Sequence, residues 1–204
     1  MSYQNRVDPF SNIVAHPARG MFTGNRGTLH GANGQLGKAR WIGKRWIICL
    51  LDFDGRRKQV MKAGEYTNLF FLDEATALAA GHRPCFECRR ADAKAYCAAI
   101  ERVTGKRPSA ADLDKDIFGE VGPSLRSGKR EDVDASSLPA CAMAASEGDA
   151  WLVTDRGMRR WSFDGYGPEE PFSSAPVQRL TPALSVAALR GGYRPALAAM
   201  LAGA

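Results

Sequence analysis

The stretch FFLDEATALAAGHRPCFECRRADAKAY, residues 70–96, decides how the rest of this chain is interpreted. It begins with an apolar run and continues with Asp73, a good N-cap residue, ahead of a helix-forming segment. Gly81 and then Pro84 follow in the order that ends a helix. The stretch therefore predicts a short helix that starts at Asp73 and ends before Gly81, and a second helix over residues 91–104 beyond a turn.

The turn between the two predicted helices carries Cys85-Phe86-Glu87-Cys88. Two thiols three residues apart on a tight turn can face one metal ion, and a tetrahedral zinc site then needs two more donors. We expect Cys49 and His30 to complete it, because both precede the turn in the same half of the chain. Cys49 fits equally well as an inward residue of an apolar strand. The more remote candidates are His82, His16 and Cys141.

A metal-free interpretation of the same turn is also open. A cysteine just before a helix has its thiolate stabilised by the helix N-terminus and by neighbouring arginines. Cys85 and Cys88 would then form a reactive dithiol or a redox switch. The surrounding sequence lacks the βαβ context of thioredoxin-type proteins, so metal binding is the preferred hypothesis.

Composition bounds the class of protein. The chain has 204 residues, 45% apolar and 25% charged, which is typical of a globular protein. It has no apolar run near twenty residues and no secretory signal at its start, so we expect a cytoplasmic protein without a membrane span. Five cysteines, an odd number with one close pair, favour metal or thiol chemistry over a disulfide framework.

Charge is unevenly distributed along the chain. Residues 1–110 carry 18 Lys and Arg against 9 Asp and Glu, whereas residues 111–204 carry 10 against 13. A basic half predicts contact with polyanions, and nucleic acid is the expected partner. The candidate phosphate contacts are Arg56, Arg57 and Lys58 at the tip of a predicted hairpin, together with Arg83, Arg89 and Arg90 around the cysteine turn.

The remaining patterns predict an α+β protein in two units, residues 1–110 with a Gly-rich N-terminal extension and residues 111–204. In the first unit we expect short strands in the Gly-rich segment and a buried strand over residues 45–53. Residues 56–60 are expected to form the partner strand of that buried strand. In the second unit, residues 105–149 read as a connector with one short helix near residues 113–118. A hairpin over residues 150–163, a strand at 176–180 and a helix after Thr181-Pro182 follow.

The segment EATALAAGHRPCFECRRADA, residues 74–93, resembles the end of the zinc-binding DNA-repair domain of Ada-type proteins. In that family a strand leads to a short "EALAAG" helix, an "FRPCxRC" turn and a further helix. The similarity extends over about residues 45–97, under a third of the chain. It implies a small β-hairpin and helix module that holds zinc and contacts DNA.

The chain departs from that family at the first half of the metal site. The family holds zinc with a C-x3-C pair and a C-x2-C pair, and its methyl acceptor lies in the first pair. Residues 54–66 contain no cysteine or histidine. We therefore expect a nucleic-acid backbone-binding protein with a zinc-holding module that does not accept methyl groups. An enzyme or redox protein that uses the Cys85 or Cys88 thiolate, and a structural or partner-binding protein, are the alternatives.

Overall fold

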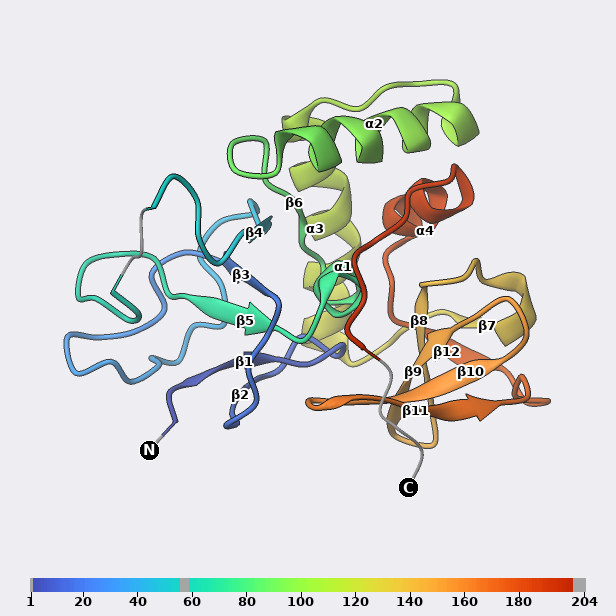
Figure 1. The fold of residues 1–204 in the computed structure, drawn as a ribbon, viewed down its shortest axis with the longest axis horizontal. Helices are drawn as coiled ribbons and strands as arrows, with labels where there is room; N and C mark the ends of the chain where they lie inside the picture. Colours follow the sequence, from blue (N-terminus) through green and yellow to red (C-terminus); the bar gives the residue numbers. More distant parts are fainter. Residues whose placement is uncertain (1, 56–58, 200–204) are drawn as a thin grey trace.

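The two sheets of this protein flank a central pair of helices. The computed structural model describes residues 2–55 and 59–199, and this part of the chain holds four α-helices and two six-stranded sheets, one mixed and one antiparallel. Figure 1 shows helices α1 and α3 between the sheets, with α2 above them. The predicted α+β class is confirmed.

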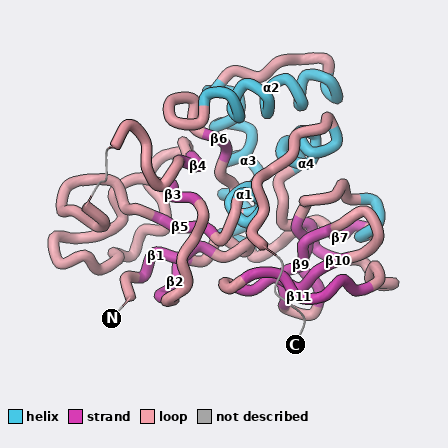
Figure 2. The backbone as a smooth tube through the Cα atoms, viewed as in Figure 1, coloured by secondary structure: helices cyan, strands magenta, loops and turns pink. Residues whose placement is uncertain are grey.

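The first sheet has the order β2-β1-β5-β3-β4-β6. Its strands are β1 (Gln4–Val7), β2 (Ile13–Ala15), β3 (Phe22–Asn25), β4 (Ile47–Cys49), β5 (Leu69–Phe71) and β6 (Arg83–Pro84). Neighbouring strands are antiparallel except for two parallel pairs, β1 with β5 and β4 with β6. Long loops join these short strands (Figure 2). The short strand β3 lies in the Gly-rich segment as predicted, but a long loop follows it up to β4 where the sequence predicts further short strands.

The second sheet is antiparallel and has the order β11-β10-β9-β8-β12-β7. Its strands are β7 (Asp132–Val133), β8 (Met143–Ser146), β9 (Asp149–Val153), β10 (Met158–Ser162), β11 (Gly165–Glu170) and β12 (Val177–Arg179), and a 3-10 turn covers Ala135–Ser137. The predicted hairpin over residues 150–163 is confirmed as β9 and β10, and the predicted strand at residues 176–180 as β12.

The helices around the cysteine turn form as predicted. Helix α1 (Glu74–Ala79) begins after Asp73, whose side chain accepts a hydrogen bond from the Thr76 backbone N–H at 2.9 Å. Helix α2 (Arg90–Thr104) buries Ala93, Tyr96, Cys97 and Ile100, while Val103 is exposed. Helix α4 (Ala183–Arg190) follows Pro182. No helix within residues 2–55 and 59–199 has the length and apolar character needed to cross a membrane.

Helix α3 (Ala110–Ser127) is far longer than the predicted short helix near residues 113–118. The second half of α3 contains Gly119, Gly122 and Pro123, which disfavour a helix, and for this reason the sequence predicts only its first half. Two features outweigh them. The side chains of Ser109 and Asp112 form a capping box, and Leu113, Ile117 and Val121 place a buried apolar row along the helix. Tertiary packing therefore overrides local propensity here.

The predicted strand over residues 45–53 shrinks to β4, three residues long. Its neighbours in the sheet are β3 and β6, so residues 59 and 60 form no partner strand. Beyond Cys49 the Leu50 N–H donates to the Cys88 sulfur instead of to a strand, and the side chains of Leu50 and Leu51 are exposed. The predicted phosphate contacts Arg56, Arg57 and Lys58 lie outside the described residues.

The larger apolar cluster contains residues from both sides of the predicted unit boundary at residue 110. Among its fully buried members are Phe71, Ile100, Leu113 and Ala144. The two units therefore share core packing.

Candidate metal centre

The pairing of β4 with β6 brings Cys49 beside the cysteine turn. These strands are parallel, with Ile48 opposite Pro84, and the Cys85 N–H donates to the Ile48 carbonyl at 3.0 Å. The next register position places Cys49 alongside Cys85. Because side chains alternate along a strand, the buried Ile48 points into the core and Cys49 points to the opposite face.

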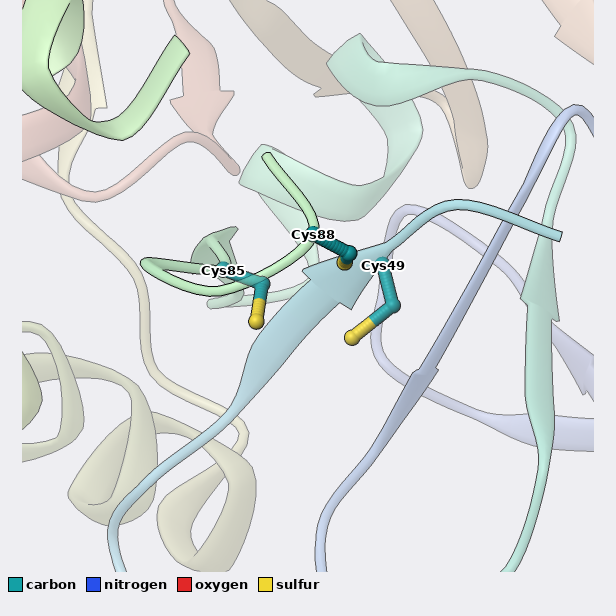
Figure 3. A group of neighbouring side chains, drawn as sticks. All are labelled: Cys49, Cys85 and Cys88. Atoms are coloured by element: carbon teal, nitrogen blue, oxygen red, sulfur yellow. The ribbon is translucent and has the colours of Figure 1, made fainter. Parts of the chain in front are cut away.

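The turn that follows β6 adds the third thiol. The Sγ atoms of Cys49, Cys85 and Cys88 all lie within 4.8 Å of one another, and the sulfurs of Cys49 and Cys85 face each other in Figure 3. Thiolates bound to zinc at about 2.3 Å lie about 3.8 Å apart in a tetrahedron. A small inward shift of the three sulfurs is enough to reach that geometry, so the cluster fits a metal ion such as zinc.

Backbone amides and the neighbouring thiols set the charge of the cluster. A hydrogen bond from the Cys49 thiol, helped by the N–H groups of Glu87 and Cys88, lowers the pKa of Cys85 to about 5. The Glu87 nitrogen lies 3.4 Å from Cys85 Sγ. Donating to Cys85 raises the pKa of Cys49, and burial raises that of Cys88. Because zinc binds thiolates, metal binding must displace the protons that the raised pKa values of Cys49 and Cys88 favour.

The structure does not bring His30 into this cluster. Its Nδ1 is hydrogen-bonded to Thr67 Oγ1 at 2.7 Å and its Nε2 to the Lys62 carbonyl at 3.0 Å. Both ring nitrogens are therefore engaged elsewhere. Within the described part of the chain the cluster has three members. His82, another candidate, is fully buried, and its ring packs against the rings of Phe71 and Trp46.

Two of the predicted phosphate contacts lie inside the fold. Arg83 donates to both carboxylate oxygens of Asp114, at 2.9 and 3.0 Å. Arg89 is paired with Glu74 and Asp92, each at 2.9 Å. These guanidinium groups fasten the cysteine turn to the helices and are not available to a phosphate, which corrects the expectation for both arginines. Arg90 is exposed, as a phosphate contact requires.

The sequence interpretation missed the buried carboxylate that organises the region behind the cluster. Glu74 is only 1% exposed and accepts hydrogen bonds from Arg89, from the Tyr193 hydroxyl and from the Ala196 N–H. Its neighbour Asp73, predicted only as a helix cap, also accepts from Tyr166. These partners lie up to 122 residues from Glu74 along the chain, and no local pattern points to them.

The number of protein ligands distinguishes structural zinc sites from zinc sites that act on a substrate. Structural zinc sites in proteins close with four protein ligands, while sites that act on a substrate keep three and leave one position for water or the substrate. The described residues supply three. Comparison of the chain with protein-family models, with curated proteins and with solved structures finds no match.

Proposed function

We propose that this protein binds one zinc ion through Cys49, Cys85 and Cys88. The observation that carries the proposal is the convergence of three sulfurs within 4.8 Å, from a strand end and a turn 36 residues further along the chain. Soft thiolate donors select zinc, copper(I) or iron–sulfur clusters over hard cations. A bound zinc would hold the thiolates deprotonated and offer a Lewis-acidic fourth position.

The three residues would also give the zinc a structural role. Cys49 belongs to β4, and Cys85 and Cys88 lead into α2, so a shared ion would clamp the edge of the first sheet to that helix. All five cysteines are free thiols. Thiolate ligands need a reducing compartment, which supports a cytoplasmic location.

Kinship of residues 45–97 with the Ada-type domain stays part of the proposal. It is supported by the order of β5, α1, the cysteine turn and α2, and by the sequence motif quoted above. The three-cysteine donor set differs from the four cysteines of that family. Residues 59 and 60 form no strand beside β4, so the module that we propose is a strand, helix, turn and helix without the predicted hairpin, followed by a second unit.

Metal analysis of the purified chain tests the zinc site. We expect about one zinc per chain after purification under reducing conditions, and less than half of that in Cys49→Ser, Cys85→Ser and Cys88→Ser. Cys141→Ser and His30→Ala serve as controls that keep the metal, because neither side chain belongs to the cluster. Full zinc content in Cys49→Ser, or loss of zinc in His30→Ala, would contradict the proposed ligand set. A metal-free chain with fast-reacting thiols would favour the redox alternative.

Contact with nucleic-acid backbone is a second proposal. It is supported by the charge of residues 1–110, with 18 Lys and Arg against 9 Asp and Glu, and by the exposure of Arg90. A salt titration with duplex DNA of arbitrary sequence tests it. Affinity should fall steeply with salt, and Arg90→Ala should reduce the slope by about one phosphate contact. Binding that does not respond to salt would contradict the proposal.

A further inference from the structure

A basic pocket lies on the opposite end of β4 from the three cysteines. Its volume is about 460 Å³, inside the range of about 300–1,000 Å³ usual for small-molecule sites. The loop before β4, the end of β3 and the first turns of α3 form its walls. The lining residues are Asn25, Gly27, Ile42, Gly43, Lys44, Arg45, Tyr66, Ala111, Asp114 and Lys115.

The charges of this pocket suit an anion. Lys44, Arg45 and Lys115 are exposed, and none of them forms an ion pair with a described residue. The lining includes one carboxylate, Asp114, and Arg83 already binds both of its oxygens from the core side. Two carboxylates lie close enough to act on these cations, Asp114 on Arg45 and Asp112 on Lys115, but the first is hydrogen-bonded to Arg83 and the second to Ser109. The three exposed cations therefore leave the pocket with an excess of positive charge, and phosphate is the common biological anion that such a group binds.

The uncharged part of the lining suits a flat ring. Tyr66 is 53% exposed and Ile42 is 57% exposed, so two large apolar faces are open at the same pocket. An exposed tyrosine ring is a surface on which a nucleobase stacks. Asn25 adds an amide, which can both donate to and accept from a base edge.

The pocket is preformed by the backbone around Gly27. The Ile42 N–H donates to the Arg26 carbonyl at 2.6 Å, and the Thr67 N–H donates to the Gly27 carbonyl at 3.1 Å. Gly27 has φ +106°, and a Cβ placed there would lie 2.8 Å from the Ile42 Cβ. The backbone of Arg26 and Gly27 thus holds both Ile42, on one side of the pocket, and Thr67, the residue next to Tyr66, on the other.

We propose that this pocket binds a nucleoside phosphate, with the phosphate held by Lys44, Arg45 and Lys115 and the base stacked on Tyr66. The same chemistry is offered by a free nucleoside monophosphate and by one unit of a single-stranded nucleic acid. The proposal does not rest on the zinc site, because no cysteine lines the pocket.

Calorimetric titration of the full chain tests the proposal with three probes: inorganic phosphate, adenosine monophosphate and a ten-nucleotide oligo(dA). We expect adenosine monophosphate to bind about tenfold more tightly than phosphate, because only the nucleotide can stack. Tyr66→Ala should abolish that difference and Tyr66→Phe should keep it. Arg45→Ala combined with Lys115→Ala should weaken all three probes by roughly tenfold or more. An oligonucleotide that binds more tightly than the mononucleotide assigns the site to nucleic acid, and equal affinity assigns it to free nucleotides.

Matched controls separate this site from general charge effects and from the zinc site. Lys94→Ala removes an exposed lysine of α2 that does not line the pocket, so it should leave binding unchanged. Cys85→Ser tests independence from the metal, provided that circular dichroism shows the variant folded. Absence of binding by both nucleotide probes overturns the proposal, as does nucleotide binding that is unaffected by Tyr66→Ala and by the double variant.

Discussion

The Tyr193 hydroxyl donates a hydrogen bond of 2.6 Å to Glu74 Oε1, across 119 residues of chain. The other carboxylate oxygen of Glu74 accepts from the Ala196 N–H at 3.0 Å, and Arg89 supplies the compensating charge at 2.9 Å. Glu74 opens α1, and Arg89 directly follows Cys88. The segment around Tyr193 is therefore bound to the same buried group that positions the cysteine turn.

Loss of this hydrogen bond should destabilise the fold. We expect Tyr193→Phe to lower the free energy of unfolding by about 1–3 kcal/mol, since a buried carboxylate loses a donor. Glu74→Gln should cost more, up to about 3–5 kcal/mol, because Asp92, at the half-exposed side of the pair, then becomes the one carboxylate that the structure shows beside the buried Arg89 charge. Urea denaturation measures both changes. Tyr3→Phe, at a tyrosine that is 51% exposed, is the matched control and should be neutral. Equal stability of Tyr193→Phe and the unmodified protein would contradict this account.

Zinc should protect the cysteine turn in particular. The N–H groups of Glu87 and Cys88 donate to Cys85 Sγ, and a metal bound to that sulfur would fix its position, so that the turn opens less often and the two amides keep their acceptor. We expect hydrogen exchange at these two amides to slow by about tenfold or more on zinc addition. The Val153 amide, bonded to the Ala142 carbonyl in the second sheet, should change much less. A uniform change over the whole chain would show that zinc acts elsewhere.

Acid should weaken the fold through His82. Burial, and then the neighbouring Arg26 guanidinium, lower the pKa of His82 well below its usual value. The unfolded chain therefore takes up a proton first, and stability falls as pH drops below about 6.5, by up to about 1.4 kcal/mol per pH unit. His82→Gln should flatten the dependence of unfolding free energy on pH between 6.5 and 5. Parallel curves for the two proteins would rule out His82 as the titrating group.

Helix α3 offers a matched pair of glycine substitutions. A Cβ at Gly119 would meet nothing within 4 Å, so Gly119→Ala should stabilise the protein by roughly 0.5–1 kcal/mol. A Cβ at Gly122 would lie 3.1 Å from the Phe118 ring, and Gly122→Ala should gain less or lose stability. Thermal unfolding of both variants measures the difference. A larger gain at Gly122 would contradict the packing described here.

Local signals account for what the sequence predicts well. Asp73 and Gly81 delimit α1, apolar spacing marks α2, and the cysteine turn lies between them, because each depends on residues within one or two turns. Cys49 is different: the sequence leaves it open between a ligand and a core residue, and the parallel pairing of β4 with β6 is what places it beside the turn.

What the sequence could not supply depends on distant partners. His30 is a plausible metal ligand until Thr67 and Lys62 occupy its nitrogens. Arg83 and Arg89 resemble surface cations until Asp114 and Glu74 pair with them. Charge alone does not say whether an arginine faces solvent or neutralises a buried acid, since that depends on residues brought together by the fold.

Because Glu74 needs hydrogen bonds from Tyr193 and Ala196, the region around α1 cannot complete its fold early in protein synthesis. Chains emerge from the ribosome N-terminal end first, and the residues up to the cysteine turn appear long before residues 193–196. Until then Glu74 lacks two of its hydrogen-bond donors, and a nascent chain must expose the surface around α1 that the later segment covers. A ribosome stalled before residue 193 would carry an incomplete fold that chaperones recognise, even with all three metal-binding cysteines already synthesised.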